Sequence, residues 1–172
     1  IEYRKCERSI YIRKITEDMR ILTKLFLLIC VLISWTYSQD KPSGAIQFNP
    51  DQLKWIDAPP PLPAGAKISI LEGNPKAEGI FTIRVQCPPY FKVPVHTHPK
   101  DERVTVISGS IYVGFGDKMD TTKADKFIAG SYYLNPANTT HYVFTQDEGC
   151  IFQVTGLGPW GIEYLNESED KK

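Results

Sequence analysis

Val-His-Thr-His-Pro-Lys-Asp-Glu-Arg-Val-Thr-Val-Ile-Ser-Gly, residues 95–109, places two imidazoles and a carboxylate within seven positions. Alternate residues of a β-strand project to the same face, so His96 and His98 are predicted to point the same way, and Glu102 shares their parity. The third and last histidine of the chain, His141, lies in a second turn-rich segment. Imidazole nitrogens and a carboxylate are suitable ligands for a divalent transition metal. The sequence therefore predicts one metal site built from both segments.

Two alternatives bear on this site. Asp101 stands beside Glu102 and is the rival carboxylate ligand, although parity with the histidines favours Glu102. The plainer interpretation is that the three histidines are unrelated surface or core side chains.

Two motifs carry a resemblance to a known family. The spacing His-x-His, three residues, Glu, six residues, Gly is met by His96, His98, Glu102 and Gly109. A second pattern of Gly, five residues, Pro-x-Gly, two residues, His, three residues, Asn is met in register, with two substitutions, by Gly130, Pro136, Asn138, His141 and Thr145. Together they resemble the two signatures of the cupin family. The resemblance implies an all-β fold, an antiparallel jelly-roll β-barrel, with one metal held by His96, His98, Glu102 and His141.

The departures from the family pattern have physical interpretations. Tyr90 stands where a glycine often precedes the first histidine, and the preceding Pro88-Pro89 predicts a proline-stiffened approach in place of a glycine turn. Asn138 replaces a glycine, and asparagine tolerates a left-handed backbone better than most residues. Thr145 replaces the final asparagine, so no role is carried over to it.

The rest of the chain supports a barrel. Short β-branched and aromatic runs are separated by Gly, Pro, Asn and Asp, which is typical of a sandwich or barrel. The predicted strands are 67–72, 79–87, 93–97, 104–108, 110–115, 131–134, 141–145, 150–155 and 161–165, with one helical turn at 118–126.

The chain divides by composition into five segments. Residues 1–18 precede the first methionine and are expected to be an untranslated or extension segment, and residues 19–38 read as a signal peptide. Its apolar run, Leu25 to Trp35, is shorter than the ~20 residues that span a bilayer. Cleavage after Ser38 and export to a periplasm or the exterior are predicted. An N-terminal arm with a Pro-rich connector (39–66), the barrel (67–165) and a charged tail (166–172) follow.

Composition argues against a nucleic-acid partner. The whole chain has 20 basic and 20 acidic residues, of which the first 38 positions hold seven basic and four acidic. Cleavage therefore leaves 13 basic and 16 acidic residues, a net charge of −3. No basic patch stands out, and a stable membrane anchor after cleavage is not expected. Cys87 and Cys150 remain, either as a disulfide of an oxidising compartment or as buried thiols.

Function is predicted less sharply than fold. Three nitrogens and a carboxylate leave one or two coordination positions open, which is typical of a catalytic metal, whether Cu, Mn, Fe, Zn or Ni. A metal-dependent enzyme acting on a small molecule is favoured, first an oxidoreductase of the dioxygenase or oxidase kind, then an isomerase or lyase. A non-catalytic ligand-binding or sensing module and a vestigial packing barrel are the alternatives, and family resemblance implies a homodimer. Pocket candidates are Tyr112, Tyr132, Tyr133, Tyr142, Phe144 and Gln153, with Arg84 and Arg103 as candidates for an anionic substrate.

Overall fold

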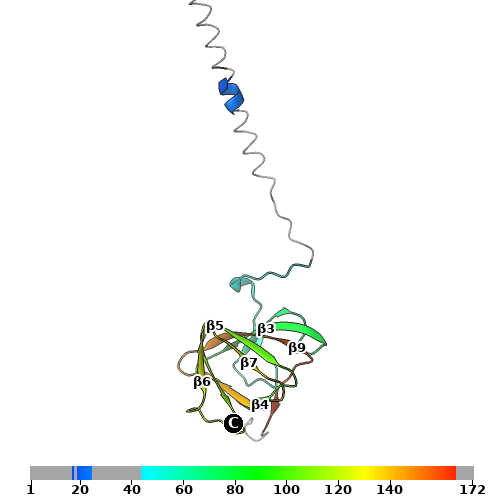
Figure 1. Ribbon diagram of the computed structural model, residues 1–172, viewed down its shortest axis with the longest axis vertical. Coiled ribbons are helices and arrows are strands. Elements are labelled where there is room, and N and C mark those ends of the chain that lie inside the picture. Colours follow the sequence, from blue (N-terminus) through cyan, green and yellow to red (C-terminus); the bar gives the residue numbers. More distant parts are fainter. Residues whose placement is uncertain (1–16, 18, 25–43, 166–172) are drawn as a thin grey trace, which may run out of the picture. The chain divides into compact units, whose positions relative to one another are not determined.

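The computed structural model describes Glu17, residues 19–24 and residues 44–165 (Figure 1). By its internal contacts the chain divides into two units, Ile1–Ala45 and Ile46–Lys172. In the first unit residues 19–24 are helical, and the Thr23 hydroxyl donates a hydrogen bond to the Met19 carbonyl (2.7 Å). The described part of the chain contains no helix that is both long and apolar enough to span a membrane. The predicted extension apart from Glu17, most of the predicted signal peptide and the charged tail lie outside the described residues.

The second unit is an antiparallel β-barrel, which confirms the predicted fold class. After a short 3-10 helix, Pro50–Gln52, its strands are β1 (Ile56–Asp57), β2 (Lys67–Glu72), β3 (Gly79–Cys87), β4 (Lys92–Thr97), β5 (Glu102–Phe115), β6 (Asp125–Ile128), β7 (Tyr132–Asn135), β8 (His141–Phe144), β9 (Cys150–Gly158) and β10 (Glu163–Tyr164).

The strands follow the order β1-β2-β3-β9-β5-β8-β4-β10, with β6 and β7 also paired to β5. β5 crosses the molecule: its first half pairs with β7 and β9, and its second half pairs with β6 and β8 (Figure 1). The change of partner falls at Gly109, whose φ of +71° favours glycine. One long strand thereby joins two curved halves of the jelly roll.

The core lies between the two halves. In β3 the buried residues Phe81, Ile83, Val85 and Cys87 occupy alternate positions, so their side chains share the face of the strand that is directed toward the core. The neighbouring strands β9 and β5 of the same sheet contribute further β-branched side chains, including Val104, Val106 and Val154. This alternation is the sequence pattern that predicted the strands.

Two local predictions were wrong. The predicted break between 108 and 110 does not occur, because the left-handed glycine turns β5 without ending it. Residues 118–126 form no helix; a bend and turn lead into β6 at Asp125, where the backbone pairs with β5. Among the arm residues that the structure describes, 44–66, the strand residues are Ile56 and Asp57.

The positions that depart from the cupin pattern keep its backbone. Asn138 has a φ of +60°, as its substitution for glycine predicted. Tyr90 has a φ of +59°, so the glycine-like turn is retained and the expected proline-stiffened replacement was wrong; the exposed tyrosine ring avoids a clash. Thr145 closes this turn, because its hydroxyl accepts from the Phe91 amide (2.9 Å) and donates to the Pro88 carbonyl (2.7 Å).

The two cysteines of the barrel are neighbours across strands. Cys87 in β3 and Cys150 in β9 are directly paired in the ladder, and both are buried free thiols.

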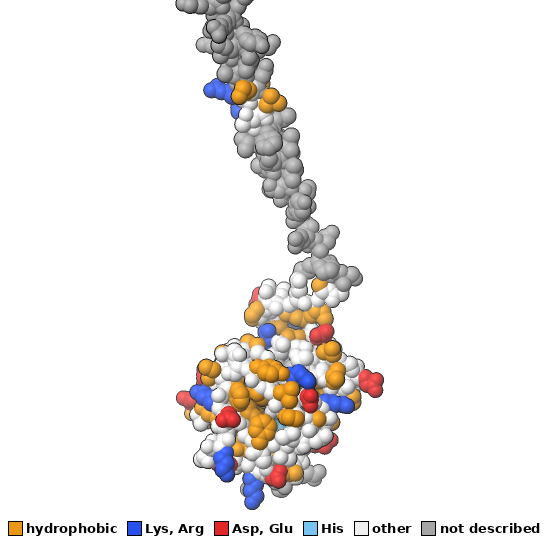
Figure 2. All heavy atoms as spheres, in the orientation of Figure 1, with side chains coloured by type: hydrophobic (Ala, Val, Ile, Leu, Met, Phe, Trp, Pro, Cys, Tyr) orange, Lys and Arg blue, Asp and Glu red, His pale blue; other side chains and the backbone are white. Residues whose placement is uncertain are grey.

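On the face of the barrel in Figure 2, hydrophobic side chains gather centrally while Lys, Arg, Asp and Glu are scattered singly. That face carries no concentrated basic patch among the described residues.

Candidate metal centre

The three histidines converge inside the barrel from two strands. His96 in β4 is the ladder partner of His141, the first residue of β8. His98 follows the end of β4, and the chain bends at Pro99 before Glu102 opens β5. The parity argument was therefore wrong for Glu102, which lies on a different strand from His96. The turn between the strands, and not a shared strand face, directs the carboxylate toward the imidazoles.

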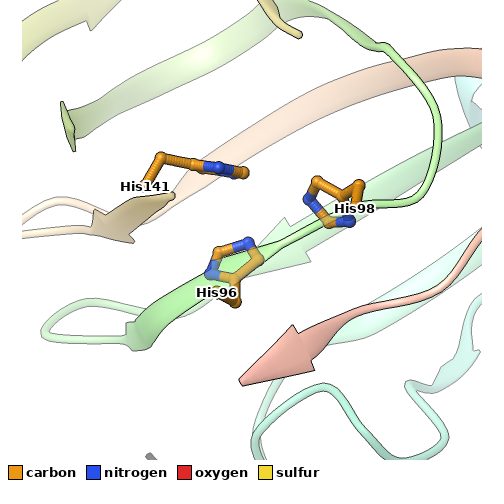
Figure 3. A group of neighbouring side chains, drawn as sticks. All are labelled: His96, His98 and His141. Carbon is orange, nitrogen blue, oxygen red and sulfur yellow. The ribbon is translucent and has the colours of Figure 1, made fainter. Parts of the chain in front are cut away.

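The imidazole rings form a compact cluster. One ring nitrogen from each of His96, His98 and His141 lies within 4.8 Å of the other two. Ring centroids are separated by 4.9 Å for His96–His98, 4.2 Å for His96–His141 and 5.1 Å for His98–His141. Figure 3 shows the rings pointing toward one another from the strand, the following loop and the facing strand. All three are at most 3 % exposed, so bulk water is kept from them.

Backbone carbonyls set the orientation of each ring. Each ring donates a hydrogen bond from Nδ1 to a backbone carbonyl. His96 donates to Pro94 (2.6 Å), His98 donates to Gly161 (2.7 Å), and His141 donates to Thr139 (3.0 Å). A carbonyl only accepts, so Nδ1 carries the proton and Nε2 of a neutral ring keeps its lone pair. Nε2 of His98 and of His141 is buried and has no hydrogen-bond partner among the described residues. Buried polar atoms of this kind normally have a partner, and a metal ion would satisfy both lone pairs.

Glu102 supplies an anionic oxygen beside these nitrogens. Its Oε2 lies 3.4 Å from His98 Nε2 and 3.8 Å from His141 Nε2. The first separation is an electrostatic contact without the angle of a hydrogen bond. Asn135, the ladder partner of Glu102 on β7, donates from Nδ2 to the same oxygen at 2.8 Å. The buried amide thus holds the carboxylate toward the imidazoles.

Burial and mutual repulsion keep part of this cluster uncharged. Burial, followed by the neighbouring His141 and His98, lowers the pKa of His96 to about 3. Burial is also the main cause of the lowered pKa of His141. Burial alone would raise the pKa of Glu102, but His98, His141 and the Asn135 hydrogen bond outweigh it and bring that pKa to about 2. Burial alone would lower the pKa of His98, but the Glu102 carboxylate outweighs it and raises that pKa. Neutral His96 and His141 beside an ionised carboxylate are in the protonation states that metal binding requires, whereas a protonated His98 would have to release its proton.

The rival carboxylate has other partners. Asp101 Oδ1 accepts from the Ala137 amide (3.0 Å), and Oδ2 pairs with the exposed Arg103 guanidinium (3.1 Å). Asp101 therefore ties the β4–β5 turn to the loop before His141, and Arg103 is engaged there at the surface.

A cavity of about 30 Å³ adjoins the cluster. His96, His98 and Glu102 line it together with Cys87, Tyr133 and otherwise apolar side chains, chiefly Val85, Val93, Val143, Phe152, Val154 and Trp160. Among the described residues, no lysine or arginine lines it. The volume is enough for about one water-sized molecule.

Of the six predicted pocket residues, Tyr133 lines this cavity. Gln153, the neighbour of the lining residue Phe152, does not. Tyr142 donates its hydroxyl to the Asp120 carbonyl (2.6 Å), and Tyr112 stacks on Phe144 (centroids 4.9 Å apart). Tyr132 is exposed, while Gln153 and Arg84 line a different hollow of about 330 Å³ that the arm residues Ile46 and Phe48 also border.

Sequence reasoning missed two residues of the site. Asn135 carried no signal, because its role arises from strand pairing with Glu102. Trp160 stacks on His98, with ring centroids 4.6 Å apart and planes inclined by 18°. Its place after Gly158-Pro159 indicated a turn and nothing about an imidazole 62 positions earlier.

A jelly-roll barrel with three convergent, buried histidines at these motif positions has the cupin fold. Residues 40–158 match the family described as a domain of unknown function, DUF4437, and the chain belongs to that family.

One curated relative matches part of the chain. Over 72 residues the chain is 31 % identical to germin-like protein 3-1 of Oryza sativa subsp. japonica, an alignment that covers 41 % of this chain and 32 % of the relative. The chain thus aligns with about a third of that curated relative's length.

Solved structures show the same fold at low identity. The polyketide cyclase RemF from Streptomyces resistomycificus superposes with a TM-score of 0.62 at 18 % identity, over 73 % of this chain and 89 % of that one. A putative acetylacetone dioxygenase from Methylibium petroleiphilum superposes with a TM-score of 0.55 at 21 % identity, over 76 % of this chain and 88 % of that one. An RmlC-like cupin from Shewanella frigidimarina superposes with a TM-score of 0.52 at 17 % identity, over 68 % of this chain and 94 % of that one.

Proposed function

We propose that this cupin is a metal-dependent enzyme that acts on a small molecule, with one divalent transition-metal ion held by His96, His98, Glu102 and His141. The observation that carries the proposal is the set of imidazoles whose Nδ1 atoms are bound to backbone carbonyls, while buried Nε2 atoms of His98 and His141 have no hydrogen-bond partner among the described residues. Such an ion would act as a Lewis acid or redox centre.

The protein side chains around the ion have separable roles. Asn135 orients the Glu102 carboxylate, and the carbonyls of Pro94, Gly161 and Thr139 orient the rings. The apolar walls keep bulk water from the cavity, which strengthens electrostatic interactions inside it. Burial raises the pKa of Tyr133 well above its usual range, so this cavity-lining phenol stays protonated and can donate a hydrogen bond to a ligand.

Within this class we favour oxidoreductase chemistry of the dioxygenase or oxidase kind, with isomerase or lyase chemistry next. A cavity of about 30 Å³ accepts a molecule as small as dioxygen, and no cationic side chain of the described residues lines it to hold a phosphate or carboxylate. One structural relative is described as a putative acetylacetone dioxygenase and another as a polyketide cyclase. The ligand set suits Cu, Mn, Fe, Zn or Ni.

The test begins with elemental analysis of the purified full chain, for which we expect about one metal ion per chain. Glu102→Gln removes the carboxylate charge and should lower metal affinity at least roughly 10-fold. Asp101→Asn is the matched control on the adjacent residue and should leave metal content unchanged. Equal metal content in the two variants would contradict the ligand assignment.

The loaded protein is then incubated with a panel of small organic substrates under air and under argon. Oxygen consumption together with substrate loss, only under air, supports an oxidoreductase. Substrate loss under both atmospheres favours isomerase or lyase chemistry. Retained metal without turnover favours the binding or sensing module, and a stable protein that never binds metal favours a vestigial barrel.

We also propose that the chain is exported after removal of residues 19–38 and that the barrel forms a homodimer. The support for export is the basic and apolar pattern of that segment. Amino-terminal sequencing of the protein from culture fluid or periplasm should begin near Gln39, and light scattering should give twice the monomer mass.

A further inference from the structure

A second, larger cavity lies where the Pro-rich connector meets the barrel. Its volume is about 340 Å³, and its lining is almost entirely apolar, with Pro59, Pro60 and Pro61 on one side and Ile68, Ile70 and Ile83 on the other. Asn74 and Lys76 also border it, and no acidic side chain of the described residues does. The volume falls within the ~300–1000 Å³ typical of small-molecule pockets.

Hydrogen bonds hold the segments that form this pocket. Tyr164 donates its hydroxyl to the Pro61 carbonyl (2.8 Å), which fastens the connector to the strand beside His96. The amide of Ala58 donates to the Ala66 carbonyl (2.9 Å), and the amide of Trp160 donates to the Pro75 carbonyl (2.7 Å). The pocket is therefore preformed, so a ligand does not have to order these loops.

The pocket shares a wall with the metal-facing cavity. Leu62, Trp160 and Ile162 line both spaces, and the Trp160 ring stacks on His98. Trp160 Nε1 is buried and has no hydrogen-bond partner among the described residues. An unpaired buried donor is unfavourable, so a ligand that offers an acceptor atom at this wall gains affinity.

We propose that this pocket binds the apolar body of an uncharged organic substrate, with an acceptor oxygen such as a ketone directed toward Trp160 and the metal centre. The inference rests on the proposed metal-dependent function and names its substrate class. A carboxylate or phosphate buried in the pocket is disfavoured, because Lys76, the one cationic side chain among the described lining residues, is exposed and the rest of the wall cannot compensate a buried charge. The apolar body occupies the outer pocket, and Leu62, Trp160 and Ile162 form the wall between it and the metal-facing cavity.

The first experiment measures binding of two neutral probes, naphthalene and 2-acetonaphthone, to the full chain with and without metal. Both should bind saturably at one site per chain, and the ketone should bind about fivefold more tightly through its acceptor oxygen. Trp160→Phe keeps a ring but lacks the N–H, so it should abolish the difference between the probes. An unchanged preference would overturn the role of Trp160.

A matched pair of substitutions locates the site. Ile70→Glu places a charge in the pocket and should weaken both probes at least roughly 10-fold. Ile80→Glu changes an isoleucine that is similarly exposed on the neighbouring strand but does not line the pocket, and it should have no effect. Equal loss in both variants, or no probe binding, sinks the proposal. Binding that appears only on dilution, as a dimer dissociates, would show that a second copy occupies the pocket and would also overturn it.

Proximity to the metal centre is tested separately. In protein loaded with Mn²⁺, the probe's proton resonances should broaden strongly compared with the Zn²⁺-loaded form. Probe binding without such broadening in a manganese-loaded chain means that the pocket is not beside the metal. A chain that binds probes but no metal refutes the proposed function and leaves the apolar pocket itself supported.

Discussion

Asn135 illustrates how much of the site depends on one residue that does not itself offer a strong metal ligand. Its side chain is fully buried, and one amide hydrogen is donated to Glu102 Oε2 while Oδ1 has no partner among the described residues. The hydrogen bond to Glu102 is therefore the one that the Asn135 side chain makes among the described residues. Removing it frees Glu102 to rotate away from the imidazoles.

We expect Asn135→Ala to weaken metal binding about 10- to 100-fold, because neighbours that orient a ligand contribute that much to affinity. The measurement is competition with a chelator of known affinity, beside a thermal melt of the metal-free protein. Asn74→Ala, at an exposed asparagine, is the control and should keep the wild-type affinity. A melting change without an affinity change would mean that Asn135 only supports the fold.

The thiols of Cys87 and Cys150 are predicted to react slowly. Burial raises the pKa of Cys87 well above its usual range and raises the pKa of Cys150 to about 12. A higher pKa means less thiolate at pH 8, by roughly 10³-fold for Cys150 relative to an ordinary thiol near 9.

Labelling with a disulfide reagent at pH 8 should therefore be orders of magnitude slower in native than in urea-unfolded protein, and it should accelerate as pH rises. Comparable labelling rates in the two states would show that the thiols are accessible. Mass spectrometry of the untreated purified protein distinguishes paired from free cysteines.

At the scale of the element, β5 depends on the glycine at its bend. A Cβ on Gly109 would lie 1.9 Å from the Gly149 carbonyl oxygen, and the φ of +71° is itself unfavourable for other residues. Gly130 also has a positive φ, +88°, but a Cβ there would meet open space. The two positions separate backbone strain from a steric clash.

Gly130→Ala should cost about 1–2 kcal/mol of unfolding free energy, the penalty of a left-handed conformation. Gly109→Ala should cost more than this, because β9 must move away from β5 to relieve the contact. Urea denaturation of both variants provides the comparison. Equal losses would show that the segment at Gly149, just before β9, shifts freely.

At the scale of the whole molecule, the metal would connect strands from different parts of the barrel. The proposed ligands lie in or next to β4, β5 and β8, so the bound ion cross-links them only in the folded state. A ligand that binds only the native state stabilises it by about 4 kcal/mol when its concentration is roughly 1000 times Kd.

Chelation is therefore expected to lower the melting temperature by on the order of 10 °C, and added metal should restore it. His141→Ala should melt at nearly the same temperature with and without chelator. A wild-type melting temperature that does not change when the chelator is added would contradict the proposal that the protein holds an ion tightly.

Much of the fold could be predicted because strand alternation and turn chemistry are local properties. Phe81, Ile83 and Val85 alternate with more polar neighbours, and the boundaries of β3 follow from that pattern. Continuity of β5 through Gly109 could not be predicted, since a glycine with a positive φ either ends a strand or turns it, and pairing with β9 decides which.

The sequence by itself determined the barrel class, the four candidate ligands and the left-handed turn at Asn138, because motif spacing and backbone preferences are written in neighbouring residues. Only the tertiary structure decided that Glu102 reaches the histidines from a separate strand, that Asn135 orients it, and that Trp160 stands between the inner cavity and the apolar pocket. Those relations join residues far apart along the chain, and they exist only once strand pairing has closed the barrel.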